Sequence, residues 1–131
     1  MATINYDGKG EHEAIMSAHT LVIYEQEFKS GLIEDVYGRI VVPETEKSGL
    51  VVADYTIDNW LAYIKALWAM LKTASDLAKA RGLKAEEVAS FDEWSMDAVE
   101  IDLSQVSSFV LTQCQKGLFR AGAAASEGKP A

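Results

Sequence analysis

One long stretch of the chain has a clear helical pattern of apolar residues. Within residues 56–82, apolar side chains recur with the i, i+3, i+4, i+7 spacing of one helix face. The residues of this stripe are Trp60, Leu61, Ile64, Leu67, Trp68 and Leu71. Thr56 is a favourable N-cap, and Gly82 follows Lys79 and Arg81 as a C-terminal glycine does. The pattern predicts one helix from Thr56 to Gly82, about 37 Å long.

The apolar surface of this predicted helix is wider than one buried face needs. Tyr63, Ala66, Met70 and Leu77 lie beside the stripe and widen it to more than half of the circumference. We therefore expect a central helix that also offers a flank to a partner. The side chains predicted to point inward are those of Trp60, Ile64, Leu67 and Trp68.

Partner binding is expected on that flank and at one further aromatic residue. Trp94 ends an acidic turn, and aromatic residues of this kind either fill a core or dominate the binding energy of an interface. The predicted partner-binding residues are Tyr63, Met70, Leu77 and Trp94.

Shorter patterns predict the elements that precede the long helix. Residues 3–6 and 11–16 flank the turn sequence Asp7-Gly8-Lys9-Gly10, which predicts an N-terminal hairpin. Ser17 is a favourable N-cap for the helix that follows it, and residues 32–37 predict one or two further helical turns.

Patterns on both sides of the long helix predict the remaining elements. Two β-branched runs, residues 39–42 and 50–53, indicate a second hairpin or a loop. Residues 84–91 predict a short helix, and residues 91–94 an acidic turn between aromatic residues. The last helix is expected to start at Asp102, which has capping-box spacing to Gln105. Its predicted inward residues are Val106, Phe109, Val110, Cys114 and Leu118.

Together these elements predict an α+β fold that is mainly α-helical. We expect a small helical domain over residues 1–120, with one or two short β-hairpins packed around the long central helix. A chain of 131 residues is long enough for one such core. Residues 121–131 are small, polar and aperiodic, so they are expected to form a flexible C-terminal tail.

The charge of the chain narrows the range of partners. Twenty acidic and 12 basic residues give a net charge of −8, and the basic residues are scattered along the chain. Nucleic-acid binding is therefore not expected, because phosphate binding needs clustered Lys and Arg. No run approaches the roughly 20 apolar residues of a membrane span. Residues 1–7 lack a signal-peptide pattern, so the chain is expected to stay in the cytosol.

No group of residues predicts catalysis or metal binding. His12 and His19 are the two imidazoles, and both are expected at the solvated surface because a metal site needs three or four converging ligands. Cys114, the single cysteine, is expected to be a small buried apolar residue. The sequence has no Gly-x-Ser-x-Gly turn and no phosphate-binding glycine motif, so catalytic and cofactor sites are not expected. The carboxylates expected on a solvated helix face are Glu25, Glu27, Glu34 and Asp35.

Three short strings, taken in order, resemble a known family. They are Tyr24-Glu25-Gln26-Glu27-Phe28, Leu67-Trp68-Ala69-Met70 and Ser90-Phe91-Asp92-Glu93-Trp94. With the N-terminal strand pair, and with residues 32–36 after the first string, they resemble the tail assembly chaperones of long-tailed bacteriophages, particularly phages of Gram-positive hosts. The resemblance covers residues 2–120, and residues 39–53 have no counterpart in it.

The resemblance implies a non-enzymatic and ATP-independent role. Such chaperones coat the helical tape measure protein, keep it soluble, recruit tail tube subunits and are absent from the mature virion. The resemblance thus implies two partners, the tape measure protein and the tail tube protein, and a homo-oligomer in the host cytoplasm. In many of these phages a ribosomal frameshift near the end of the gene gives a longer form. Gly128-Lys129 is a dipeptide that a slippery heptamer could encode.

Two other functions stay open from the sequence. A permanent structural phage protein, of the head–tail joining or tail terminator type, would form a stable ring and would be present in purified virions. A small-molecule enzyme would need a pocket with convergent polar groups, which the residue list does not indicate.

Overall fold

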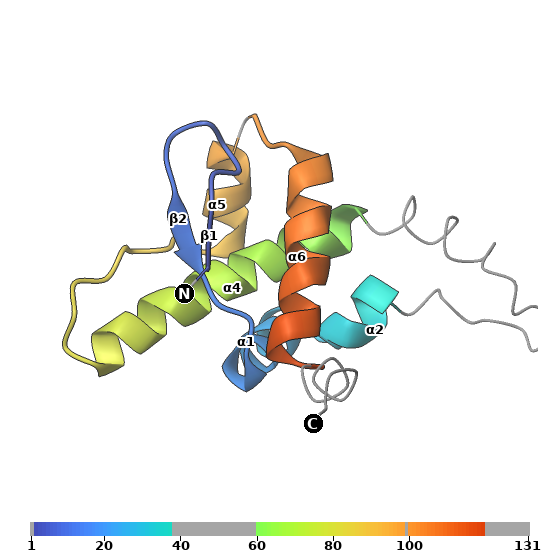
Figure 1. The fold of residues 1–131 in the computed structure, drawn as a ribbon, viewed down its shortest axis with the longest axis horizontal. Helices are drawn as coiled ribbons and strands as arrows, with labels where there is room; N and C mark the ends of the chain where they lie inside the picture. Colours follow the sequence, from blue (N-terminus) through green and yellow to red (C-terminus); the bar gives the residue numbers. More distant parts are fainter. Residues whose placement is uncertain (1, 38–59, 99, 120–131) are drawn as a thin grey trace, which may run out of the picture.

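Helices make up most of the part of the chain that the structure describes. The computed structural model describes residues 2–37, 60–98 and 100–119. In chain order the elements are β1 (Ala2–Ile4), β2 (His12–Ala14), α1 (Ala18–Phe28), α2 (Leu32–Tyr37), α4 (Trp60–Ala80), α5 (Phe91–Asp97) and α6 (Leu103–Gly117) (Figure 1). The predicted fold class is confirmed, since these residues form a mainly helical domain with a small antiparallel hairpin. The predicted second hairpin and the predicted tail lie outside the described residues.

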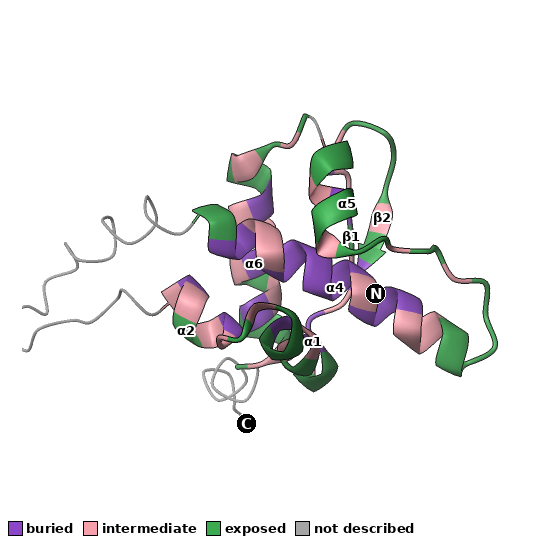
Figure 2. Cartoon of the chain, turned by 180° about the vertical axis from the view of Figure 1, so that it is seen from behind, coloured by how far each residue is buried: buried purple, intermediate pink, exposed green. Residues whose placement is uncertain are grey.

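The long helix α4 is the centre of the fold. Helices α1, α2, α5 and α6 and strand β2 all pack on it (Figure 1). Its middle is buried over most of its circumference, as Figure 2 shows. The buried residues are Ala62, Tyr63, Ala66, Leu67, Trp68, Ala69, Met70, Leu71, Thr73, Ala74 and Ser75. Burying one large apolar side chain contributes about 1.5–3 kcal/mol, so the burial of α4 stabilises the fold strongly.

Most of the residues predicted to point inward from α4 do so. Leu67 and Trp68 are buried, and Ile64 is partly buried against the core. Trp60 is the exception, because it lies in the first turn and keeps 36% of its surface exposed. Its ring packs on Tyr63 instead, with centroids 6.3 Å apart. Residues 56–59, where the helix was predicted to begin, lie outside the described residues.

The C-terminal end of α4 is closed by the glycine that the sequence indicated. Gly82 has a φ of 71°, a left-handed conformation that glycine adopts without steric cost. Its N–H donates to the Lys79 carbonyl at 3.1 Å, and the Leu83 N–H donates to the Ala78 carbonyl at 2.8 Å. These two bonds form a Schellman motif and satisfy the last carbonyls of the helix.

The predicted N-terminal hairpin is confirmed and is tied to α4 through its backbone. β1 and β2 run antiparallel, with Ala2 opposite Ala14. Side chains alternate along each strand, so Ile4 and Ala14 face the core. After β2, the Ile15 N–H donates to the Met70 carbonyl of α4 at 3.1 Å. This bond fixes the position of the hairpin on the helix.

A pair of buried hydroxyl groups joins α1 to α4. Ser17 begins α1 as its N-cap, as predicted. Thr20 Oγ1 lies 2.8 Å from Thr73 Oγ1, and both residues are buried. Thr20 Oγ1 also donates to the Ile15 carbonyl at 2.8 Å and accepts from the Ser17 N–H at 3.0 Å. Thr73 Oγ1 also lies 2.8 Å from the Ala69 carbonyl oxygen. Each hydroxyl has one proton, so the two protons are shared among the two carbonyls and the contact between Thr20 and Thr73. Both hydroxyls are thus satisfied, as buried polar groups must be, and they fix where α1 crosses α4.

A connected series of aromatic rings packs α1, α4 and α5 together. The ring of Phe28 is edge-on to those of Tyr24, Trp68 and Phe91, with centroids 4.9, 5.7 and 4.9 Å away. Phe91 also contacts Trp94, with centroids 6.0 Å apart. Edge-to-face pairs of this kind add about 0.5–1.5 kcal/mol each beyond the burial of their area. The series therefore stabilises contacts between helices that are far apart in sequence.

Helix α6 begins and packs as predicted. Asp102 Oδ1 accepts from the Gln105 N–H at 3.1 Å, which caps the helix. Val106, Val110 and Cys114 are buried, and α6 packs on α4. Burial raises the pKa of the Cys114 thiol to about 11, so the thiol stays protonated and weakly reactive. The prediction that Cys114 is a buried apolar residue is confirmed.

The segment after α4 corrects the prediction of a helix over residues 84–91. Residues 83–90 contain neither helix nor strand. The indole N–H of Trp68 donates to the Ala89 carbonyl at 2.9 Å. This bond to α4 holds the segment in an open conformation that the local sequence does not specify. The prediction was wrong because a tertiary contact outweighs a weak helical preference.

The predicted acidic turn over residues 91–94 is in fact the start of α5. Ser90 Oγ accepts from the Glu93 N–H at 3.3 Å and acts as the N-cap. Asp92 and Glu93 lie in the first turn, where carboxylates interact favourably with the helix dipole. The acidic residues between the aromatic residues therefore belong to a helix start.

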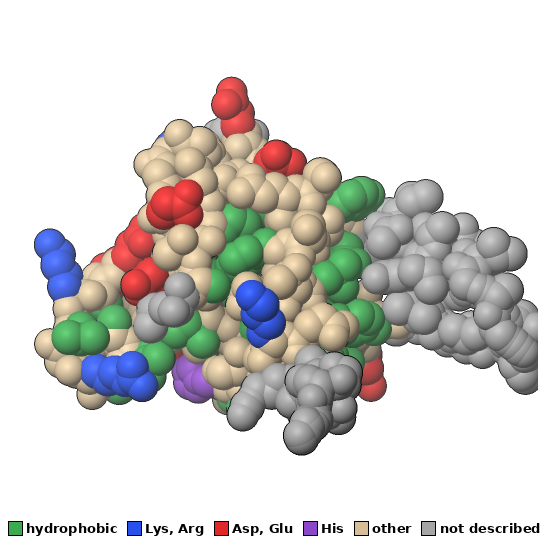
Figure 3. Space-filling view, viewed as in Figure 1, with side chains coloured by type: hydrophobic (Ala, Val, Ile, Leu, Met, Phe, Trp, Pro, Cys, Tyr) green, Lys and Arg blue, Asp and Glu red, His purple; other side chains and the backbone are tan. Residues whose placement is uncertain are grey.

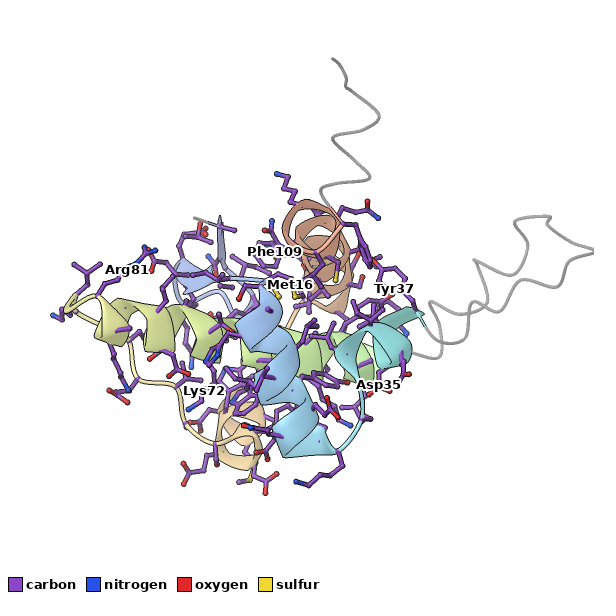
Figure 4. All side chains as sticks on the ribbon, turned by 90° about the horizontal axis from the view of Figure 1, so that it is seen from below. Met16, Asp35, Tyr37, Lys72, Arg81 and Phe109 are labelled. Atoms are coloured by element: carbon purple, nitrogen blue, oxygen red, sulfur yellow. The ribbon has the colours of Figure 1, made fainter. Side chains whose placement is uncertain are left out.

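The substitution Gly117→Ala is expected to destabilise the protein. A Cβ at this position would overlap the Met16 carbonyl oxygen, which lies between the hairpin and α1 beside α6 (Figure 4). We expect a loss of about 1–3 kcal/mol in the free energy of unfolding, as for other overpacked sites. Urea unfolding followed by circular dichroism measures it.

Gly31→Ala is the control, because its Cβ would meet only the flexible Glu34 side chain. It is expected to change the free energy of unfolding little. At Gly117, which lies in α6, helix propensity alone would favour Ala over Gly by about 1 kcal/mol. A stabilised Gly117→Ala variant would therefore contradict the close contact between α6 and Met16.

Thr20→Val is expected to cost about 1–3 kcal/mol, because it leaves the Ile15 carbonyl and the Ser17 N–H without their partner. Thr112→Val, at an exposed position of α6, is the matched control and should change stability by less than about 0.5 kcal/mol. Thermal and urea unfolding compare the two variants. Equal stability of both would show that the buried hydroxyl pair is unimportant.

Candidate partner-binding surface

Two of the four predicted partner-binding residues lie in the core. Tyr63 and Met70 are both 0% exposed. The structure therefore contradicts the partner-facing position predicted for them. The physical reason is that the hairpin, α1 and α6 together cover the middle of α4 on several sides. The wide apolar surface of α4 that suggested a free flank is covered by other elements of the same chain.

The other two predicted residues line two separate clefts. Leu77 is half-buried in one cleft. Trp94 is 8% exposed and lines the other, with its indole N–H donating to the Tyr6 hydroxyl at 3.0 Å. The α4 residues of the two clefts differ by about half a helical turn, so the clefts lie on opposite faces of the C-terminal half of α4.

The first cleft, called the apolar cleft below, lies between the start of α1 and the C-terminal half of α4. It has a volume of about 650 Å³ and a mostly apolar wall. Its lining residues are Ile15, Ser17, His19, Thr73, Asp76, Leu77, Lys79 and Ala80. At its edge, His19 Nε2 and Asp76 Oδ2 lie 3.0 Å apart and join α1 to α4. Such a cleft accepts apolar side chains of a partner, while the polar edge orients them.

The second cleft, called the acidic cleft below, lies between α4, the hairpin, α5 and residues 83–90. Its volume is about 580 Å³. Its lining residues are Tyr6, Glu11, His12, Glu13, Leu71, Ala74, Ser75, Ala78, Lys84, Ala85, Glu86, Glu87, Val88, Ala89, Trp94 and Asp97. Five of these residues are acidic, and they come from three parts of the chain. Figure 3 shows acidic side chains gathered on this side of the molecule.

His12 joins the hairpin to residues 83–90 at the acidic cleft. Its Nδ1 is 2.9 Å from Glu86 Oε2, and its Nε2 is 3.5 Å from Asp7 Oδ1. Its ring lies against that of Tyr6, with centroids 5.0 Å apart. The side chain is only 18% exposed, so the prediction of a solvated surface residue is wrong for His12. The same prediction is correct for His19, whose side chain is 53% exposed.

Asp35 also departs from its predicted role as a solvated carboxylate. It is half-buried on α2 and accepts hydrogen bonds from the Tyr24 hydroxyl at 2.7 Å and from the Ser30 hydroxyl (Figure 4). Burial, together with the Asp35 carboxylate, raises the pKa of Tyr24 far above its ordinary value. The Tyr24 phenol therefore stays protonated and serves as a structural donor between α1 and α2.

The sequence-based prediction missed the acidic cleft. Glu11 and Glu13 are two residues apart in the hairpin and so share one side of it, and Glu86-Glu87 is an adjacent acidic pair. These pairs were visible in the sequence. Their approach to one cleft was not, because it depends on the open segment that follows α4.

Neither the described residues nor the comparisons with known proteins indicate a metal site, a membrane span or a family. In the described residues, no three His, Cys, Asp or Glu side chains are arranged to hold a metal ion. No helix in that part of the chain combines the length and the apolar character that a membrane span needs. Searches against protein-family models, curated proteins and solved structures give no match.

Met70→Gln is expected to destabilise the fold rather than to remove a binding residue. The substitution places a polar amide in a fully buried apolar site and should cost about 2–5 kcal/mol. Met96→Gln is the matched control, because Met96 on α5 is 72% exposed. Urea unfolding should separate the two variants clearly. An unchanged midpoint for Met70→Gln would restore Met70 as a surface residue.

Proposed function

We propose that this protein is a tail assembly chaperone of a long-tailed bacteriophage. In this role it binds the tape measure protein, keeps it soluble and helps to recruit tail tube subunits. It acts without ATP and without catalysis, in the host cytoplasm, and it is absent from the mature virion. Several copies of the chain associate with one another along the tape measure protein.

The observation that supports this role best is the apolar cleft. The hydroxyl pair of Thr20 and Thr73 fixes α1 on α4 beside it, so the cleft exists before a client arrives. Leu77 and Ala80 offer apolar surface on its α4 wall. A helical client presents apolar side chains at i, i+3, i+4 and i+7, and each side chain that is fully buried adds about 1.5–3 kcal/mol. Many copies on one long client would add their contributions through avidity.

The charge of the protein supports the same role. With a net charge of −8, copies of the chain bound to an apolar client keep the assembly soluble through mutual repulsion and hydration. Large apolar residues are also exposed outside the two clefts. They are Val22, Trp60, Leu61, Leu83, Met96 and Phe119.

The residues that carry the family resemblance meet in one place. The ring of Phe28 contacts those of Tyr24, Trp68 and Phe91, and Phe91 contacts Trp94. These five residues come from the three strings that resemble the chaperones. The resemblance therefore involves packing residues of one core, which determine a fold. The residues proposed to bind the client lie beside that core.

Co-expression tests the function directly. The chain is produced together with a candidate tape measure protein chosen from the gene products encoded downstream, and the soluble fraction of that candidate is measured. We expect soluble tape measure protein with the wild-type chain and aggregated protein without it. A tape measure protein that stays insoluble in both cases would overturn the proposal.

Leu77→Gln tests the apolar cleft within the same assay. It removes apolar surface from the cleft wall while keeping a residue of good helix propensity. Leu61→Gln is the matched control, because Leu61 lies on the same helix, is 56% exposed and lines neither cleft. We expect at least about a threefold loss of soluble client with Leu77→Gln and no loss with Leu61→Gln. A threefold loss corresponds to a fraction of the free energy of burying one side chain. Equal results for both variants would place client binding elsewhere.

Mass spectrometry of purified virions separates the chaperone from a permanent structural protein. The chaperone is expected to be absent from virions. A stoichiometric amount of this chain in virions would favour the head–tail joining or tail terminator role instead.

A further inference from the structure

The acidic cleft carries more negative charge than the rest of the fold neutralises. Glu86 pairs with His12, and Glu87 Oε2 lies 3.2 Å from Lys79 Nζ. Within the described residues, no ion pair involves Glu11, Glu13 or Asp97. The basic residue among the lining residues, besides His12, is Lys84. Carboxylates around a cleft with low-dielectric walls focus the electrostatic potential and attract cations.

Apolar and aromatic residues form part of the lining of this cleft. Leu71 and Ala74 of α4 line the cleft together with the carboxylates, and so does Val88 of the segment after α4. The rings of Tyr6 and Trp94 are 5.7 Å apart and are joined by a hydrogen bond of 3.0 Å. Lysine and arginine combine an apolar stem with a cationic end, so both match a cleft that is lined by apolar and acidic side chains. Aromatic faces add a cation–π contribution.

One wall of the cleft also offers free backbone groups. Residues 84–88 make no backbone–backbone hydrogen bond within the described part of the chain. The segment is nevertheless held at both ends, by the Leu83 N–H on the Ala78 carbonyl and by the Trp68 indole on the Ala89 carbonyl. A positioned segment with open N–H and C=O groups can pair with the backbone of an extended peptide.

We propose that the acidic cleft binds a lysine- or arginine-bearing peptide segment of a partner protein. A peptide fits better than a small cation, because the cleft combines carboxylates from three elements with free backbone groups. A second copy of this chain is a poor occupant, since each copy carries a net charge of −8 and its basic residues are scattered. The site lies on the opposite face of α4 from the apolar cleft, so the proposal does not rest on the proposed function.

Fluorescence anisotropy with a basic peptide tests the proposal. The probe is a fluorescein-labelled decapeptide of alternating Lys and Ala, titrated with the full chain at low salt. We expect saturable one-to-one binding that weakens as salt is added, and no binding of the matching Glu-Ala peptide.

The double variant Glu11→Gln, Glu13→Gln should raise the Kd of the peptide about fivefold, as expected for two weakened charge contacts. The matched control is Glu25→Gln, Glu27→Gln, two exposed carboxylates of α1 that do not line the cleft. Both double variants change the net charge by the same amount. The control should change the Kd by less than about twofold, because distant charges are screened by salt.

Three results would overturn the proposal. The first is an equal loss of affinity in both double variants, since the peptide would then respond to net charge alone. The second is displacement of the peptide by spermine at the same concentration of positive charge, since a small cation would then suffice. The third is the absence of saturable binding.

Leu77→Gln distinguishes this site from the apolar cleft, since it should leave peptide affinity unchanged. Loss of client solubilisation with retained peptide binding would therefore concern the proposed function alone.

Discussion

The middle of α4 is apolar on nearly every side, and water must be excluded from all of these sides at once. No single neighbour can do this, so the hairpin, α1, α2, α5 and α6 surround the helix. Close contacts then fix each neighbour in place. The Ile15 N–H donates to the Met70 carbonyl, and the Thr20 and Thr73 hydroxyls are in contact. Helix α6 lies so close to the Met16 carbonyl that Gly117 has no space for a Cβ. The burial of one helix thus determines the arrangement of the domain.

The same arrangement explains where the surface is hollowed. Towards its C-terminal end α4 extends beyond the elements that cover its middle, and only partial walls remain beside it (Figure 1). On one face, α1 and Leu77 leave the apolar cleft. On the other face, the hairpin and residues 83–90 leave the acidic cleft. One helix therefore separates an apolar cleft from an acidic cleft.

Much of the fold could be predicted from local sequence, whereas the site could not. The hairpin, the Ser17 and Asp102 caps, the Gly82 end of α4 and the burial of Cys114 follow from turn, cap and periodicity rules that act over a few residues. Three of the predicted interface residues, Tyr63, Met70 and Trp94, are largely buried. Periodicity locates apolar faces but does not say which neighbours will cover them.

The sequence by itself determined that the chain forms a mainly helical domain around one long helix, because helix periodicity and caps are properties of adjacent residues. Tertiary structure decided that residues 83–90 stay open. The Trp68 indole reaches the Ala89 carbonyl only when α4 is packed. Tertiary structure also decided which apolar and acidic residues meet in clefts. The reason is that exposure and charge proximity depend on distances between segments, which no local pattern contains.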